Sequence, residues 1–234
     1  MLAGRELSLA EPPLGPLTVT LPAGRITILT GPSGSGKSRL LRILADLDLP
    51  AAGRVELEGR PAESYPAPEF RRRTAMLPAS PLLGPGAVGD LVERVRTLPH
   101  RRAAGDPLPA LRRLGLKEEI LKQAASSLST GETVRVALAL LLSGDPEVLL
   151  LDEPTGALDP TATAAVEAWV RERAAAGLAV LWVTHDPEQA ARVGDALYYL
   201  REGALRGPVT DSSRFAGIIR QLDPVGSPGG ADAG

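Results

Sequence analysis

Cysteine is absent from the 234 residues, and aromatic residues make up only 3% of the chain. Without cysteine the protein forms neither a disulfide framework nor a metal site with thiolate ligands, which fits a reducing compartment. An excess of one charge is also missing, because 28 acidic residues face 26 lysines and arginines, for a formal net charge of −2. Since no overall basic field exists, no specific nucleic-acid partner is expected.

Long apolar runs are missing as well, although 44% of the residues are hydrophobic, which is ample for a core. The longest runs cover residues 136–142 and 148–151, whereas a helix that crosses a bilayer needs about 20 apolar residues. The first residues, MLAGRELSLAEPP, lack the apolar centre of a secretory signal. We therefore expect a soluble protein whose membrane role, if it has one, passes through a partner.

The sequence does contain a phosphate-binding motif of the Walker A type. Residues 31–38 read GPSGSGKS and match G-x-x-x-x-G-K-[ST], between an apolar strand-like run at 26–29 and a helical pattern at 40–44. Its glycines permit a sharp turn close to an anion, and the amides at the helix start point at phosphate. A glycine-rich turn that binds nothing is disfavoured by the intact GKS ending. The predicted nucleotide-binding residues of this loop are Gly31, Pro32, Ser33, Gly34, Ser35, Gly36, Lys37 and Ser38.

Two of these residues have distinct expected roles. Lys37 should reach the β- and γ-phosphates of a nucleotide, where it also supports catalysis, and the Ser38 hydroxyl should ligate Mg²⁺.

Strand and helix patterns alternate along much of the chain. We expect strands at 6–9, 17–21, 26–30, 54–57, 74–77, 148–151, 178–184 and, as the last one, 196–201. Helices are expected at 39–49, 88–98, 108–116, 117–123, 129–143, 161–176 and 187–193. This order predicts an α/β fold with a mostly parallel sheet covered on both faces. We predict a single domain over residues 1–222, with a helical subdomain at about 81–140, and a disordered tail at 223–234.

A second half of a nucleotide site follows the apolar strand at 148–151. Asp152 and Glu153 come directly after it, where ligand sites of open α/β sheets lie. Asp152 is placed to hold the Mg²⁺ shell, in the Walker B role, and Glu153 to orient or deprotonate an attacking water. Taken alone, this pair could also be a solvated strand end.

Three further motifs accompany these two. LSTGE at 128–132 precedes the acidic pair, GALD at 156–159 follows it, and THD at 184–186 ends the next buried strand. In this order the motifs resemble the nucleotide-binding domain of ATP-binding cassette (ABC) ATPases, over roughly residues 6–202. The resemblance implies a P-loop NTPase core of ABC type with an antiparallel β part at the N-terminus and a helical insertion.

The resemblance also implies a head-to-tail dimer with two ATP molecules in its interface. Ser129 and Gly131 of one chain would cap the γ-phosphate held by Lys37 and Ser38 of the other. Asp159 would lie near the opposite phosphate loop. His185 would contact the γ-phosphate and help to place the water; the alternative for His185 is a histidine that only caps a strand end.

The function implied is an ATP-binding and ATP-hydrolysing subunit of an ABC transporter. Its expected partners are an integral membrane permease and a second cassette, in a homodimer or a heterodimer. It would lie in the cytoplasm, on the inner face of the cell membrane. The alternatives are a soluble ABC-type ATPase that acts on a protein or nucleic-acid assembly, and a regulatory ATP switch with slow turnover. The sequence does not identify the cargo.

Some positions depart from the family pattern. No aromatic residue precedes Tyr65, so only Leu9, Ala10 and Pro12 can offer adenine an apolar contact. Arg39 stands where threonine is usual, and either pairs with the α-phosphate or lies in solvent. In the LSTGE motif Thr130 stands where glycine is usual, but Ser129 and Gly131 remain, and we expect phosphate capping to survive.

The most consequential departure lies in the segment 75–83, which resembles the family's Q-loop but has Ala79 in the place of the glutamine. That glutamine touches Mg²⁺ and water in the family and links the site to the membrane subunit. Slow hydrolysis, another coupling route or a shifted alignment would each account for Ala79, although no glutamine occurs between residues 77 and 89. The apolar loop at 81–88 either receives a partner helix or packs on the chain's own helical region.

Overall fold

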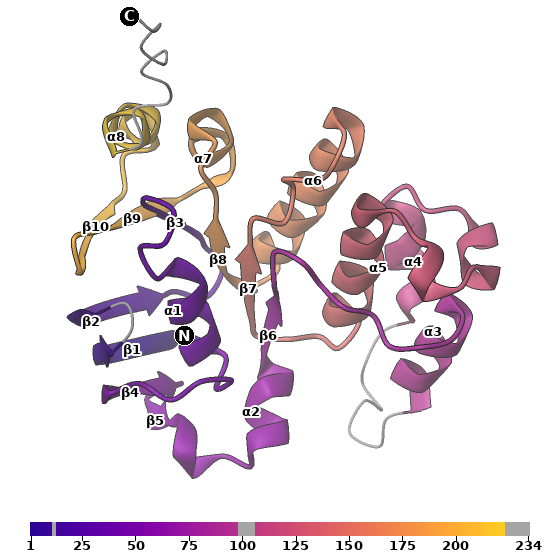
Figure 1. Ribbon diagram of the computed structural model, residues 1–234, viewed down its shortest axis with the longest axis horizontal. Coiled ribbons are helices and arrows are strands. Elements are labelled where there is room, and N and C mark those ends of the chain that lie inside the picture. The colour runs from indigo at the N-terminus through magenta and orange to yellow at the C-terminus, as the bar shows by residue number, and fades with distance from the viewer. Residues whose placement is uncertain (11–12, 98–105, 223–234) are drawn as a thin grey trace, which may run out of the picture.

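The fold was examined in a computed structural model, which describes residues 1–10, 13–97 and 106–222 (Figure 1). Two β-sheets and two groups of helices make up this part of the chain. The tail expected to be disordered, 223–234, lies outside the described residues, as does Pro12.

The larger sheet carries the apolar strands that the sequence predicts. Its order is β10 (Ala204–Val209), β9 (Ala196–Arg201), β3 (Ile26–Thr30), β8 (Ala179–Val183), β7 (Val148–Asp152) and β6 (Thr74–Leu77). The five strands from β9 to β6 run parallel, and β10 pairs antiparallel with β9 at the edge. Every residue of β3, β7 and β8 is buried, as continuous apolar strands of a covered parallel sheet are. Their carboxyl ends therefore meet at one edge.

The N-terminal strands form a separate antiparallel sheet, as expected. It consists of β2 (Leu14–Leu21), β1 (Leu2–Leu9), β4 (Ala52–Leu57) and the short β5 (Arg60–Pro61), in that order. Between this sheet and the larger one lies α1 (Lys37–Leu44), and one core cluster joins Leu21, Leu41 and Leu150 from the three layers. The helix that follows the phosphate loop is thus held from both sides.

The other face of the larger sheet is covered by helices. These are α5 (Thr130–Leu142), α6 (Pro160–Ala175), α7 (Pro187–Val193) and α8 (Phe215–Leu222). Their apolar side chains share a second core cluster with Ile28, Leu151 and Trp182 of the sheet. Both faces are covered, so the predicted α/β fold class is confirmed.

The helical segment predicted between the strands at 74–77 and 148–151 is also present. It contains α3 (Val88–Thr97), α4 (Pro107–Arg113), the 3₁₀ turns Glu118–Lys122 and Ala125–Ser127, and α5. In Figure 1 this group lies beyond β6, on the side away from the antiparallel sheet. That side of the molecule and the antiparallel sheet are therefore well separated.

Several predicted elements differ from the structure. The helix expected at 39–49 ends at Leu44, because Asp46 turns left-handed with φ 56° and Leu47 N bonds back to Arg42 O at 2.8 Å. The segment 117–123 is a 3₁₀ turn rather than a helix. Residues 196–201 are not the last strand, since β10 follows, and its Gly207 and Pro208 hide the strand pattern. Helix α2 (Ala67–Arg73), which follows Pro66 and has Pro68 in its first turn, and α8 were not expected either.

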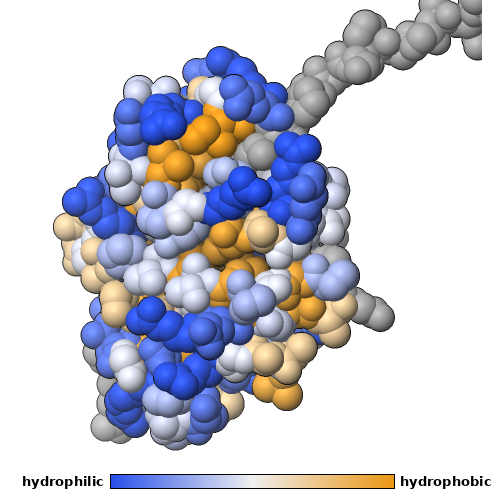
Figure 2. All heavy atoms as spheres, turned by 90° about the vertical axis from the view of Figure 1, so that its left-hand side faces the viewer, coloured by the Kyte–Doolittle hydropathy of each residue, from blue (hydrophilic) through white to orange (hydrophobic). Residues whose placement is uncertain are grey.

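The surface shows no broad apolar face on the side that carries β10 and the antiparallel sheet. There the apolar areas are divided by hydrophilic side chains (Figure 2). Among the described helices, none is long and apolar enough to cross a membrane.

Candidate functional site

The predicted phosphate and acidic residues come together at the carboxyl edge of the parallel sheet. The phosphate loop joins β3 to α1, and Asp152 of β7 lies beside Val183 of β8 in the strand register. The Asp152 carboxyl interacts with Ser38, Lys37, Glu153 and His185, which come from three separate parts of the chain. Four predicted site residues therefore surround this buried carboxyl.

The backbone of the phosphate loop needs its glycines for two different reasons. A Cβ at Gly31 would lie 2.1 Å from the Leu200 carbonyl oxygen of β9, so only glycine fits there. Gly36 precedes α1 with φ 97°, in the left-handed region that other residues avoid. The helix start is thereby aimed back across the loop, where its amides face an anion.

Two polar side chains of the phosphate loop lie where they could bind an anion. The Lys37 ammonium is 6% exposed and donates to the carbonyl oxygens of Gly31 and Pro32 at 2.7 and 2.8 Å. The Ser35 hydroxyl is buried and has no hydrogen-bond partner among the described residues. A phosphate in this turn would give that hydroxyl an acceptor and bring a negative charge to the ammonium. The loop therefore fits the phosphates of a nucleotide.

Asp152 and Ser38 provide oxygen ligands for a cation. Burial raises the pKa of the Asp152 carboxyl, against the hydrogen bond with Ser38 and the charge of Lys37, which lower it. An ionised Asp152 thus gains when a further cation binds beside it. No group of three or more His, Cys, Asp or Glu residues suited to a metal occurs in the part of the chain that the structure describes. These two ligands suit Mg²⁺, which commonly binds one or two protein groups together with phosphate oxygens.

Glu153 and His185 face each other beside the acidic strand end. His185 Nε2 lies 3.1 Å from Glu153 Oε1, and about half of the Glu153 side chain is exposed. Glu153 adopts φ 49°, an unusual conformation for a residue other than glycine, and its amide donates to Val183 O at 3.2 Å. The pair places a proton acceptor and an imidazole at the open side of the phosphate loop.

Ser129 begins α5 and already has partners within its own chain. Its hydroxyl accepts from Glu132 N at 3.3 Å and its amide donates to Glu132 Oε2 at 2.9 Å, which is a complete capping box. The hydroxyl also donates to Glu132 Oε2 at 2.7 Å. The capping bonds, from the Ser129 hydroxyl first and its amide second, lower the pKa of Glu132. Figure 1 shows α1 and α5 on opposite sides of β6, and their apolar side chains belong to different core clusters.

Gly131 and Asp159 adjoin one another on the same side. A Cβ at Gly131 would lie 3.2 Å from Ala157 O and from the Leu158 side chain. Asp159 caps α6 by accepting from Thr161 N and Ala162 N, both at 2.9 Å, and the bond from Ala162 is the main cause that lowers its pKa. The structure thus places Gly131 against the two residues that directly precede Asp159.

Four further residues bear on the departures from the family pattern. The Arg39 side chain is half exposed, and its Nε pairs with Asp48 at 3.1 Å, next to Arg42. Leu9 is 6% exposed and packs in the core, so it offers adenine little surface, whereas Ala10 is exposed. Ala79 is exposed in the loop after β6. The predictions that Arg39 and Ala10 contact the nucleotide remain predictions.

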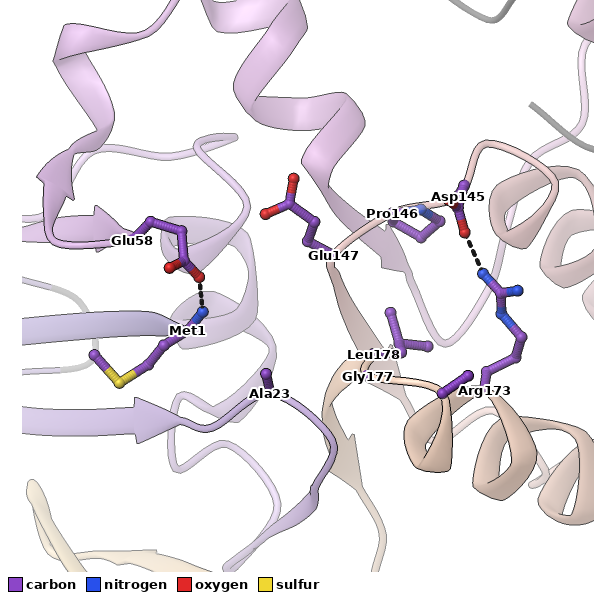
Figure 3. A pocket seen from close by; sticks show the side chains of 10 residues that line it. Met1, Ala23, Glu58, Asp145, Pro146, Glu147, Arg173, Gly177 and Leu178 are labelled. Atoms are coloured by element: carbon purple, nitrogen blue, oxygen red, sulfur yellow. Dashed lines mark hydrogen bonds and ion pairs between the residues drawn. The ribbon is translucent and has the colours of Figure 1, made fainter. Parts of the chain in front are cut away.

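A pocket of about 290 Å³ lies at the opposite edge of the sheet, where β7 and β8 begin (Figure 3). Its carboxylates already have cationic partners: Glu58 bonds the Met1 ammonium, Asp145 bonds Arg173, and Glu147 bonds Arg73. Because these charges are matched within the chain, the pocket lacks the features of the phosphate loop. The features that suit a phosphate lie instead at the carboxyl edge of the sheet.

Sequence reasoning missed one group of polar residues behind the site. Gln189 of α7 and Glu167 of α6 are buried, and Gln189 bonds Thr155, just after the acidic strand end. No short motif marks these residues, since Thr155 and Gln189 are 34 positions apart.

Comparison with known proteins agrees with this geometry. A family model described as "ABC transporter" matches residues 14–156, more than half of the chain. The nickel import ATP-binding protein NikO of Rhodobacter capsulatus is 37% identical, over 90% of this chain and 89% of that protein. The hemin import ATP-binding protein HmuV of Streptomyces coelicolor is 41% identical, over 91% of this chain and 78% of its own.

Solved structures show the same fold. The ATP-binding subunit of an ABC transporter superposes with a TM-score of 0.82 at 24% identity, over 94% of both chains. A bacterial ABC transporter cassette, MJ0796, solved as a dimer, superposes with a TM-score of 0.76 at 25% identity, over 90% of this chain and 98% of that one. The chain therefore belongs to the ABC transporter family, as one of its ATP-binding and ATP-hydrolysing subunits.

Proposed function

We propose that two cassettes bind two MgATP molecules head to tail between them, and that this dimerisation drives a separate membrane permease. Lys37, Ser38 and Asp152 of one chain hold the phosphates and Mg²⁺, and Ser129 and Gly131 of the other cap the γ-phosphate. The observation that carries the proposal is the gathering of Lys37, Ser38, Asp152, Glu153 and His185 around one strand end.

Each residue of the gathered set has a distinct task in hydrolysis. When Mg²⁺ is bound, it supplies positive charge at the phosphate oxygens. Lys37 adds a second positive charge at the phosphates, which stabilises the charge that develops during transfer. Glu153 accepts the proton of the attacking water, and His185 orients the water and the γ-phosphate from the other side. The 3.1 Å separation of Nε2 and Oε1 lets both side chains reach one small group.

The start of α5 supports the dimer. Ser129 is exposed there, and the Thr130 and Gly131 amides at this helix start can face an anion held by another chain. ATP would then lie between two chains, and the loss of the γ-phosphate would remove the negative charge that holds them together. The solved dimer of the related cassette supports this arrangement.

The permease would dock in a groove of about 610 Å³ beside the loop after β6. The groove is lined by residues 81–86, 124–126, Leu128 and Thr133, and Leu82 at its edge is 96% exposed. The far end of the loop is fixed, since Arg94 bonds Pro85 O at 2.6 Å and Ala125 N bonds Gly86 O at 2.9 Å. A fixed groove with an exposed leucine suits an apolar helix of a membrane subunit.

The sequence left two alternatives for the loop at 81–88, contact with a partner helix and packing on the chain itself, and each applies to a part of the loop. Leu83 and Pro81 pack against the chain, whereas Leu82 projects outward. Related proteins carry names for nickel import, hemin import and lipoprotein release, so the proposal commits to a permease partner at the cytoplasmic face of the membrane and not to one cargo.

Steady-state hydrolysis of ATP by the purified chain tests the site assignment. The rate should depend on Mg²⁺, and Lys37→Ala should lower it by at least about a hundredfold, because a charged phosphate contact is lost. Lys122→Ala, at an exposed lysine of the 3₁₀ turn, is the matched control and should keep the wild-type rate. Wild-type turnover by Lys37→Ala would show that the phosphate loop is assigned wrongly.

A further inference from the structure

A buried polar chain lies behind Glu153 and His185 and is not used by the hydrolysis described above. Gln189 of α7 is 3% exposed, and its Nε2 donates to Thr155 Oγ1 and to Glu167 Oε1, both at 2.9 Å. Glu167 of α6 is 6% exposed. A buried amide with two fixed acceptors has one orientation, so this contact is specific in its geometry.

Arg192 completes the chain of bonds at its outer end. It donates to both carboxylate oxygens of Glu167, at 2.7 and 2.8 Å, from the same helix as Gln189. Burial alone would raise the pKa of Glu167, but the bonds from Arg192 and Gln189 keep it below its ordinary value. Glu167 is therefore an ionised acceptor, which keeps the Gln189 amide nitrogen turned inward.

The Gln189–Thr155 bond joins two segments of the site. The segment that carries Glu153 and Thr155 is called the Glu153 arm, and the segment that carries His185 and Gln189 is called the His185 arm. Thr155 lies two residues after Glu153, in a turn closed by Gly156 N to Glu153 O at 3.2 Å. Gln189 lies four residues after His185, in a helix that Asp186 caps by accepting from Glu188 N and Gln189 N. A shift of either arm must stretch this bond.

We propose that Gln189 is a positioning residue, which holds the Glu153 arm and the His185 arm in register through Thr155. The inference rests on the proposed function, in which Glu153 accepts the proton of the water. Glu153 needs such support because its backbone is held at φ 49°, a conformation that persists only where neighbouring structure maintains it. The Glu153–His185 distance is then set from behind and not only by the two side chains.

Thr155 provides the sharpest variants. Thr155→Val keeps the shape and removes the acceptor, and Gln189→Met removes the donor, so both should lower kcat by about ten- to a hundredfold. The KM for ATP should stay within about twofold, because the phosphate loop is untouched. Thr155→Ser keeps the hydroxyl and should retain the wild-type rate.

A matched control separates positioning from a general loss of stability. Thr74 is 1% exposed and donates to Phe70 O at 2.9 Å, at the opposite edge of the sheet. Thr74→Val should lower the thermal stability without lowering kcat. Equal losses of kcat in Thr74→Val and Thr155→Val would overturn the proposal, as would a wild-type kcat in both Thr155→Val and Gln189→Met.

A double variant tests whether Glu153 is the group that Gln189 positions. In a Glu153→Gln background, Gln189→Met should not lower the residual hydrolysis further, because the two changes act on one step. A full additional loss would contradict the proposal.

Amide hydrogen exchange of the peptide 153–159 gives a test that does not need turnover. Exchange should quicken in Thr155→Val and Gln189→Met but not in Thr155→Ser. Unchanged exchange overturns the proposal even if hydrolysis is seen. Conversely, a wild-type chain without Mg²⁺-dependent hydrolysis would refute the proposed function, while exchange would still decide whether Gln189 holds the turn.

Discussion

The phosphate-loop side of the molecule and the α5 side differ in how complete they are within one chain. Lys37 and Asp152 are buried, and Ser38, Glu153 and His185 gather around them. On the other side, Ser129 faces outward with its bonds to Glu132, and Leu82 is almost fully exposed. In the proposed function, the first side is one half of a nucleotide site that is complete within the chain, and the other side consists of surfaces that contact another chain.

The two sides also differ in how well their polar groups are satisfied within the chain itself. Burial raises the pKa of the Asp152 carboxyl despite the nearby Lys37, so its negative charge is costly in the folded chain. Ser129 has its hydrogen bonds satisfied by Glu132 and loses nothing in the free chain. Changes on the first side should therefore act on chemistry and stability together, and changes on the second side should act through partners.

The largest effect is expected at Asp152. Asp152→Asn removes a ligand charge and should abolish measurable Mg²⁺-dependent hydrolysis. It should also raise the melting temperature at neutral pH without Mg²⁺, because the pKa of this carboxyl is raised by burial. The folded chain thus holds the proton more tightly than the unfolded chain, and the ionised group lowers stability as pH rises through the folded pKa.

Thermal melts across pH measure this effect. Below the ordinary pKa of an aspartate, the wild-type chain and Asp152→Asn should melt alike, since both are then neutral at this position. A lower melting temperature of Asp152→Asn at neutral pH would contradict the account of the buried carboxyl.

The second effect concerns Ser129, on the outward side. Ser129→Ala should lower hydrolysis by about a hundredfold, because Ser129 is proposed to cap the γ-phosphate that the other chain holds. It should also cost about 1 kcal/mol of stability through the lost cap. Ser64→Ala, which removes an exposed hydroxyl bonded to Pro61 O, is the control and should change neither rate nor dimerisation.

Mixing two inactive variants sharpens this comparison. A dimer of one Ser129→Ala chain and one Lys37→Ala chain has a single site with both Lys37 and Ser129 intact. Hydrolysis in the mixture should therefore recover above either variant alone. Recovery would be impossible if each chain formed its own complete site, and its absence would count against the composite site.

A third, smaller effect is expected at Ala79. Ala79→Gln should raise basal hydrolysis by up to about tenfold, if a polar group at this position reaches the water and the metal ligand sphere. Ala67→Gln, at an exposed alanine of α2, controls for an added amide elsewhere. An unchanged or lower rate with intact ATP affinity would show that more than the side chain is missing from this loop.

The smallest effect on the isolated chain is expected at Leu82. Leu82→Glu should leave basal hydrolysis within about twofold, but should remove an integral membrane protein that co-purifies with the tagged chain from solubilised membranes. Leu49→Glu changes a leucine that is 84% exposed after α1 and should keep this partner. Equal partner recovery by both variants would place the docking surface elsewhere.

Much of the phosphate-loop side of the molecule could be predicted from the sequence because local patterns encode it. Continuous apolar runs gave the buried strands at 26–30 and 148–151, and the residues directly after them gave the site. Because parallel strands share one carboxyl edge, residues 31–38, 152–153 and 185 had to lie near each other once the sheet was predicted.

Long-range pairings could not be predicted in this way. Arg39 meets Asp48 only because the helix ends at Leu44 and the chain turns back, which no local pattern indicates. Gln189 reaches Thr155 only after α7 has packed behind the acidic strand end. The edge strand β10 was missed because glycine and proline interrupt its pattern.

The central claim is that ATP joins two half-sites from different chains. Glu153→Gln is nearly isosteric but cannot accept the proton of the water, so ATP should stay bound and uncleaved. Light scattering of this variant should show the mass of one chain without nucleotide and of two chains with saturating MgATP. The same variant carrying Ser129→Ala should stay at the mass of one chain. A Glu153→Gln chain that binds MgATP and yet keeps the mass of one chain would contradict the account.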